Sequence, residues 1–121
     1  MIHSCDFSIS PYAYVENNDM TLESFDISRE EIAVIPFIKA AGKLSSGLKI
    51  IASPWSPPPY MKNNGQWQGG YLKSECYKLW ADYIRRYIDE MKKRGVNIWA
   101  ITVQNETRHH QLWESCVFTA E

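Results

Sequence analysis

The 121-residue sequence predicts an α/β fold, a partial (β/α)8 barrel that contains three strands and their helices. Segments with strand and helix patterns alternate along the chain, which favours parallel strands joined by right-handed crossovers. No glycine-rich loop follows the first or second predicted strand, and this disfavours a nucleotide-binding sheet. Because a complete barrel needs about 250 residues, we expect residues 1–121 to be a fragment of one barrel domain.

Short apolar runs predict strands at residues 2–8, 48–53 and 97–104. The first has Ile2 and Phe7 as its apolar anchors, and Pro54 ends the second. The third is a nearly continuous apolar run, which is typical of a strand buried on both faces. We therefore expect Trp99, in this run, to lie in the core together with Trp80.

Two helices are predicted between these strands. Ser28 and Glu31 fit a capping box, so a helix should begin near residue 28, with a kink or a restart that places Pro36 in a first turn. The second helix spans residues 74–94, where apolar residues recur at helical spacing, and Gly95 should stop it. The predicted apolar positions of this helix are Cys76, Trp80, Tyr83, Ile84, Tyr87, Ile88 and Met91.

The composition is that of an ordinary globular domain. With 45% hydrophobic residues and a net charge of -1, it gives no reason to expect nucleic acid or an anionic membrane as a partner. No apolar run approaches the roughly 20 residues of a membrane span, and the N-terminal residues lack a signal-peptide pattern, so no compartment is assigned. The three cysteines, Cys5, Cys76 and Cys116, form no CxxC pair and are expected to be buried thiols.

Polar clusters follow all three predicted strands: Ser4-Cys5-Asp6, Ser53-Pro54-Trp55 and Gln104-Asn105-Glu106. In parallel α/β folds, the working groups gather at the carboxyl ends of the strands. We therefore expect these three clusters to lie at one end of the sheet and to form the functional site.

Glu106 carries the sharpest chemical prediction. A partly desolvated carboxyl at the mouth of a barrel can donate a proton to a leaving oxygen, and a neighbouring amide such as that of Asn105 can bind a sugar hydroxyl. A helix cap or a surface ion pair is the alternative for Glu106. His109 and His110, together with Glu106, also suggest a metal site. One Glu-x-x-His motif without further ligands nevertheless favours a solvated loop.

The motifs resemble those of glycoside hydrolase family 30, which includes the glucosylceramidases and related β-glucanases. The resemblance runs from end to end. It rests on Ser4-Cys5-Asp6-Phe7-Ser8, Ala52-Ser53-Pro54-Trp55-Ser56-Pro57-Pro58, Met61-Lys62, Gly69-Gly70, Leu72-Lys73, Thr102-Val103-Gln104-Asn105-Glu106, Trp113-Glu114-Ser115-Cys116 and Phe118-Thr119-Ala120-Glu121.

The resemblance implies a retaining β-glycosidase that uses no cofactor and acts on glucosylceramide or a β-glucan. It implies that Glu106 is the general acid/base, that Asn105, Asp6 and Trp55 bind the sugar, and that the three strands are strands two to four of the barrel. The nucleophile of the family is a second Glu after strand seven, which this chain does not contain. Family members usually have Pro after the acid/base, and here Thr107 takes its place.

Two hypotheses of function remain open at the level of sequence. The chain is either a catalytic-domain fragment that is inactive without its nucleophile, or a noncatalytic carbohydrate-binding unit or remnant. Aromatic residues suit both hypotheses, because flat rings with polar tips stack on sugars and also pack in cores. Trp67 and Trp113 are equally consistent with a sugar cleft and with loop packing.

Overall fold

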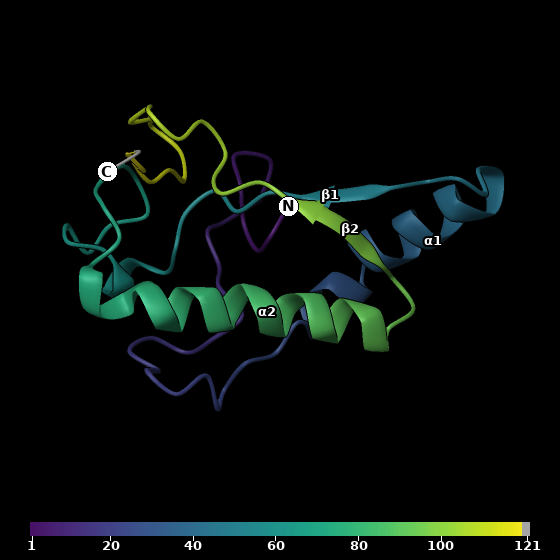
Figure 1. Ribbon diagram of the computed structural model, residues 1–121, viewed down its shortest axis with the longest axis horizontal. Helices are drawn as coiled ribbons and strands as arrows, with labels where there is room; N and C mark the ends of the chain where they lie inside the picture. The colour runs from purple at the N-terminus through teal and green to yellow at the C-terminus, as the bar shows by residue number, and fades with distance from the viewer. Residues whose placement is uncertain (120–121) are drawn as a thin grey trace.

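The computed structural model describes residues 1–119 of the chain, so the last motif quoted above extends beyond the described residues. Two strands pair with each other, and one long helix, α2, runs beneath them (Figure 1). The elements, in chain order, are the 3-10 turn Ser28–Glu31, α1 at Val34–Leu44, β1 at Ile50–Ala52, the 3-10 turns Pro59–Met61 and Ser74–Cys76, α2 at Tyr77–Lys93, and β2 at Ile98–Ile101.

The second and third predicted strands are confirmed in shortened form as β1 and β2. The two strands are parallel, with Ile50 opposite Ile98 and Ala52 opposite Ile101. α2 connects them and packs against the sheet as the crossover of a β–α–β unit. Beyond the strands the pairing continues in one more bond, from the Thr102 amide to the Ala52 carbonyl at 3.0 Å.

The prediction of a first strand at residues 2–8 is wrong. Only Ile2 joins the sheet, through a parallel bridge to Pro54 and a 2.9 Å bond from its amide to the Ser53 carbonyl. At His3 the backbone turns to a φ of 49°, in the left-handed region, and its amide donates to the Tyr14 hydroxyl instead of to a strand. A hydrogen bond to a side chain therefore takes the place of the backbone hydrogen bond of a strand, and the chain leaves the sheet after one residue.

α2 agrees with its prediction at both ends and along its buried face. All seven predicted apolar positions are buried or packed against the core. The helix ends in a Schellman motif, in which the Gly95 amide donates to the Lys92 carbonyl and the Val96 amide to the Met91 carbonyl, each at 2.9 Å. Gly95 has a φ of 79°, which glycine adopts without strain. Val96 and Met91 are both buried, as the motif requires.

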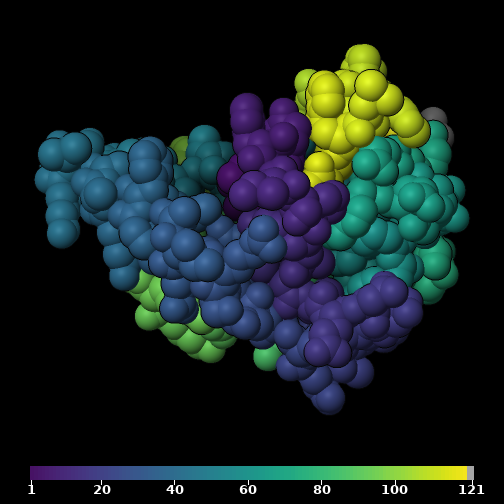
Figure 2. Space-filling view, turned by 180° about the vertical axis from the view of Figure 1, so that it is seen from behind, coloured from purple at the N-terminus to yellow at the C-terminus, as the bar shows by residue number. Residues whose placement is uncertain are grey.

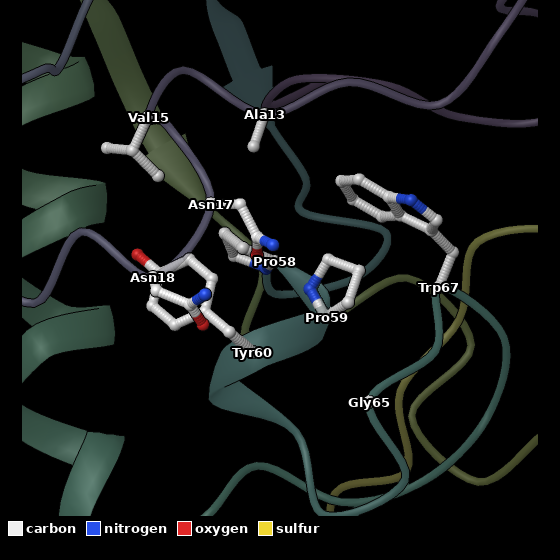
Figure 3. Close-up of a pocket in the computed structure, with 9 residues that line it drawn as sticks. All are labelled: Ala13, Val15, Asn17, Asn18, Pro58, Pro59, Tyr60, Gly65 and Trp67. Atoms are coloured by element: carbon white, nitrogen blue, oxygen red, sulfur yellow. The ribbon is translucent and has the colours of Figure 1, made fainter.

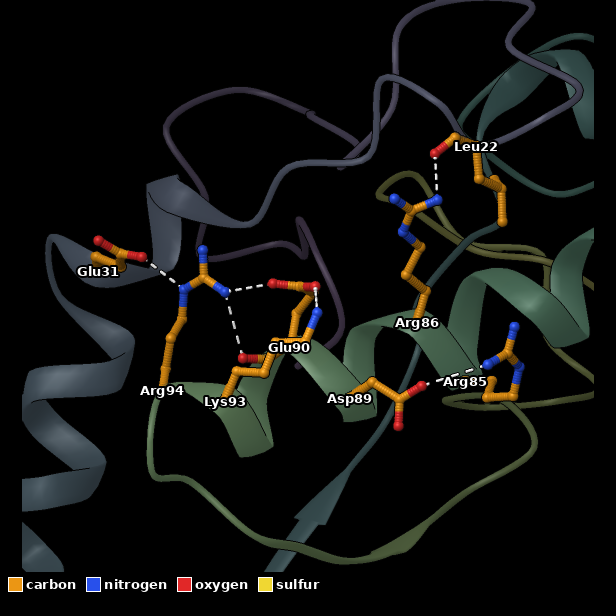
Figure 4. Close-up of polar contacts among 8 residues, drawn as sticks. All are labelled: Leu22, Glu31, Arg85, Arg86, Asp89, Glu90, Lys93 and Arg94. Carbon is orange, nitrogen blue, oxygen red and sulfur yellow. Dashed lines mark hydrogen bonds and ion pairs between the residues drawn. The ribbon is translucent and has the colours of Figure 1, made fainter.

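The capping-box prediction at Ser28 is wrong, although the helix does restart with Pro36 in the first turn of α1. The Ser28 hydroxyl donates to Asp26, and Glu31 accepts a bond from the Arg94 guanidinium. Arg94 also contacts Glu90 and so ties the Ser28–Glu31 turn to the end of α2 (Figure 4). Glu31 serves a tertiary contact in place of a local cap.

The core centres on aromatic side chains around His3. Tyr14, Tyr83 and Trp80 surround its imidazole, with ring centroids 5.6 to 6.1 Å away. The Tyr83 hydroxyl accepts a bond from the Tyr14 amide and lies 2.7 Å from His3 Nδ1, and His3 Nε2 contacts the Ser56 carbonyl. Because a carbonyl can only accept, these bonds assign the proton to Nε2 and leave Nδ1 to accept from Tyr83.

The prediction that Trp99 lies in the core is wrong, whereas Trp80 is only 4% exposed as expected. Trp99 is 60% exposed, because α2 covers only one face of the two-stranded sheet. Ile51 in β1 and Ile101 in β2 are also exposed, at 56% and 44%. The three cysteines are free and buried, as predicted, and no helix within residues 1–119 is long and apolar enough to cross a bilayer.

Because His3 is buried, the free energy of unfolding should depend on pH. Burial lowers the pKa of His3 from 6.5 to about 4, and the hydrogen bond that its ring donates to the Ser56 carbonyl only partly opposes this shift. Between these values the unfolded chain binds the proton and the folded chain does not, so the free energy of unfolding falls as the pH falls. We expect a loss of about 3 kcal/mol between pH 7 and pH 4.

Urea unfolding at several pH values between 4 and 7 measures this slope. In the His3→Gln variant the contribution is absent, so its stability should depend less steeply on pH. The exposed His109→Gln variant is the matched control and should keep the steep slope. Equal slopes in the His3→Gln variant and the wild type would contradict the assignment.

Candidate functional site

The structure brings the second and third polar clusters together at the carboxyl ends of β1 and β2. The Asn105 amide donates to the Pro54 carbonyl at 2.8 Å, and Gln104 Nε2 donates to the Trp55 carbonyl. Trp55 and Asn105 are both half-buried. The main chain thus holds Asn105 and Glu106 beside the Ser53-Pro54-Trp55 segment, as expected for neighbouring parallel strands.

Asp6 lies in the adjoining N-terminal segment, four residues after the bridge between Ile2 and Pro54. A turn holds it, in which the Ser8 amide donates to the Cys5 carbonyl at 2.9 Å and the Cys5 amide donates to the Ser8 hydroxyl at 3.0 Å. The Asp6 side chain is exposed. The space-filling view shows this segment, in purple, lying between the region of α1 and the yellow residues that follow β2 (Figure 2).

Glu106 adopts an unusual backbone conformation, with a φ of 47°. A non-glycine residue in this region stores roughly 1–2 kcal/mol of strain, and such strain is often found at functional sites. Thr107 permits it, because a proline at position 107 would push the preceding residue toward extended backbone. The departure from the family pattern at Thr107 thus bears directly on how the Glu106 carboxylate is aimed.

The loop after Glu106 is closed by its own hydrogen bonds. The His109 amide donates to the Glu106 carbonyl at 3.0 Å, and the Phe118 amide donates to the Thr107 carbonyl at 2.8 Å. Inside the loop, Gln111 Nε2 donates to Glu106 Oε2 at 3.1 Å. Among residues 1–119, the exposed Glu106 carboxylate therefore has one side-chain hydrogen-bond partner, contributed by the same loop.

A buried ammonium group, that of Lys62, holds the base of this loop. Lys62 Nζ donates to Ser56 Oγ at 2.9 Å, to the Trp67 carbonyl at 2.9 Å and to the Ser115 carbonyl at 2.7 Å. Burial lowers the pKa of Lys62 to about 8, and the nearby Cys116 thiol acts in the opposite direction. One cation thus joins the loop after β1 to the segment that closes the loop after β2.

Gly69 lets these two loops approach closely. A Cβ atom at Gly69 would meet the His110 ring at 1.9 Å, and the φ of 55° is also unsuited to an L side chain. The Gly69 amide donates to Ser115 Oγ at 2.9 Å. His110 therefore packs over the backbone of the neighbouring loop, and within residues 1–119 there is no group of three or more His, Cys, Asp or Glu side chains positioned to hold a metal ion.

A cleft of about 480 Å³ lies elsewhere among these loops, and none of the four predicted site residues lines it. The Trp67 indole and Pro59 form one side, and Asn17 and Asn18 come from the loop that follows the N-terminal segment (Figure 3). Trp67 thus lines a cleft, and its carbonyl also accepts a hydrogen bond from Lys62 Nζ, so its position supports both interpretations left open by the sequence.

Sequence reasoning missed Lys62, Gln111 and the structural role of Ser115. Met61-Lys62 and the Trp113–Cys116 motif were noticed as family motifs, but no local pattern indicates that a lysine would be fully buried or which carbonyls it would bind. Gln111 lies five residues after Glu106, a separation without regular periodicity in a loop, so its contact with Glu106 depends on how the loop closes.

The structure is an α/β fold in which two parallel strands carry the candidate site at their carboxyl ends, and comparison with known proteins identifies its family. The model of the glycosyl hydrolase family 30 TIM-barrel domain matches residues 1–121. This chain therefore belongs to glycoside hydrolase family 30.

Among curated relatives, lysosomal acid glucosylceramidase from Mus musculus is 39% identical over 111 residues, covering 85% of this chain and 22% of that protein. An endo-1,6-β-D-glucanase from Neurospora crassa is 34% identical over 113 residues, covering 87% of this chain and 24% of that protein. The crystal structure of SrfJ from Salmonella typhimurium is similar with a TM-score of 0.91 and 42% identity, over 98% of this chain and 27% of that one. The chain thus spans about a quarter of the length of these proteins.

Because the Lys62 ammonium donates three hydrogen bonds, we expect the Lys62→Met variant to be much less stable. Methionine fills similar space but leaves the Trp67 and Ser115 carbonyls without their donor, and we expect a loss of about 2–4 kcal/mol in the free energy of unfolding. Urea unfolding followed by tryptophan fluorescence measures it. The control, Lys78→Met, removes an exposed lysine from α2 and should change stability little. Equal midpoints for the two variants would show that Lys62 does not hold the loops.

Proposed function

We propose that this chain is part of the catalytic barrel of a retaining β-glycosidase, with Glu106 as its general acid/base. In this proposal, Asn105, Trp55 and Asp6 bind the sugar next to the bond that is cleaved, and β1 and β2 are the third and fourth strands of the barrel. The observation that carries the proposal is the bonding of the Asn105-Glu106 segment to the end of β1, beside Trp55, in a chain whose whole length matches family 30.

The reaction proceeds in two displacements. A carboxylate outside this chain attacks the anomeric carbon while Glu106 gives its proton to the glycosidic oxygen, which leaves as an alcohol and a covalent glycosyl-enzyme remains. Glu106, now a carboxylate, takes a proton from water as the water oxygen attacks the same carbon. The sugar is released with its original anomeric configuration, and both carboxyl groups return to their starting states. The two groups must lie about 5 Å apart.

The substrate we propose is a β-linked glucoside, either glucosylceramide or a β-glucan. The names of the relatives support this range, since one is a glucosylceramidase and another an endo-1,6-β-D-glucanase. Trp55 supplies an aromatic surface for the apolar face of a sugar ring, and Asn105 an amide for a hydroxyl group. No metal or cofactor takes part in the proposed chemistry.

Changing Glu106 in the full-length protein tests the assignment. Glu106→Gln keeps the shape and hydrogen bonding of the side chain but cannot transfer a proton, so turnover of an alkyl β-glucoside should fall by about 10²–10⁴-fold while the substrate still binds. Glu23→Gln, in another exposed loop, is the matched control and should retain full activity.

Glu106→Ala gives a second measurement. With 2,4-dinitrophenyl β-glucoside the leaving group needs no proton, so the first step should persist, and azide should accelerate the second step and yield β-glucosyl azide. An active wild type whose activity survives Glu106→Gln would refute the role of Glu106. A full-length protein that binds glucan without hydrolysing it would support the noncatalytic alternative.

A further inference from the structure

Gln111 is the one side chain that the structure places in hydrogen-bond contact with the Glu106 carboxylate among residues 1–119. Gln111 Nε2 donates to Oε2 of Glu106, at a distance of 3.1 Å. An amide nitrogen can only donate, so the oxygen that it contacts must accept. In the acid form of Glu106, the carbonyl oxygen is a better acceptor than the hydroxyl oxygen, so this bond favours the proton on Oε1, the oxygen that Gln111 leaves free.

Gln111 is itself fixed at its backbone. Its amide donates to Ser115 Oγ at 3.2 Å, and the same oxygen accepts the Gly69 amide at 2.9 Å. The Ser115 carbonyl accepts from the buried Lys62 ammonium at 2.7 Å. A continuous series of contacts thus runs from a fully buried cation, through Ser115 and Gln111, to the carboxylate of Glu106.

The left-handed conformation of Glu106 makes such support necessary. Its strained backbone, with a φ of 47°, directs the side chain into the loop, and its exposed carboxylate has no burial to restrict its rotation. A single hydrogen bond from a loop that is closed at both ends reduces this freedom. Holding an acid group within a narrow range of directions is worth much in catalysis, because proton transfer requires contact with the leaving oxygen.

We propose that Gln111 is a positioning residue that aims the Glu106 carboxyl group and selects which of its oxygens carries the proton. The inference rests on the proposed function, in which Glu106 is the acid/base. Gln111 acts through Glu106 alone and need not contact the sugar.

Two effects follow if the amide is removed by Gln111→Met. The kcat/KM for an alkyl β-glucoside, whose leaving oxygen requires a proton, should fall about tenfold, which corresponds to the loss of one hydrogen bond. The kcat/KM for 2,4-dinitrophenyl β-glucoside should stay close to that of the wild type.

The experiment compares four full-length proteins: wild type, Gln111→Met, Gln111→Glu and the control Gln66→Met. Gln66 is an exposed glutamine of the loop after β1, and its side chain makes no hydrogen bond within residues 1–119. The control should match the wild type with both substrates. Gln111→Glu keeps the length of the side chain but replaces the amide donor with a carboxylate, so its loss of kcat/KM for the alkyl β-glucoside should be at least as large as that of Gln111→Met.

The outcomes separate this inference from the proposed function. Equal losses with both substrates in Gln111→Met would indicate a general collapse of the loop and overturn the positioning role, as would a kcat/KM for the alkyl β-glucoside equal to that of the wild type. In both cases a strong effect of Glu106→Gln leaves the proposed function intact. An inactive wild type, or an active one unaffected by Glu106→Gln, overturns the proposed function and this inference together.

Discussion

The loop region of this chain depends on one buried cation. Lys62 has no carboxylate partner among the described residues, and three oxygen acceptors from the segments around Ser56, Trp67 and Ser115 replace its water. Removing an ammonium from water is costly, so the arrangement is stable only when all three segments are in place. Lys62 therefore links the loop after β1 to the loop after β2, and the positions of the residues at the strand ends depend on this link.

The regular elements were predicted where the sequence signal is local. The face of α2 and its end at Gly95 were found because helical spacing and left-handed glycine act over one or two turns. β1 and β2 were found from their apolar runs. The first strand and the Ser28 cap were predicted wrongly, because distant side chains decide both: the Tyr14 hydroxyl takes the His3 amide, and Arg94 takes Glu31.

The candidate site divides in the same way. The proximity of Asn105 to the Ser53-Pro54-Trp55 segment followed from the rule that parallel strands end on one side of a sheet. The contact between Gln111 and Glu106 could not be foreseen, since it requires the closure of a loop whose base is held by Lys62. Trp99 was misplaced for a related reason: an apolar strand indicates two buried faces, whereas α2 covers only one of them here.

Because the backbone of Glu106 is left-handed, selection for stability and selection for proton transfer would favour different residues at this position. Glycine or asparagine would occupy this conformation with less strain, and either would make the loop more stable, yet neither carries a proton to give. A screen for thermostable variants that does not measure activity should therefore select glycine or asparagine in place of Glu106. In the proposed role of Glu106 as acid/base, selection on the chemistry of its side chain maintains the strain at this position.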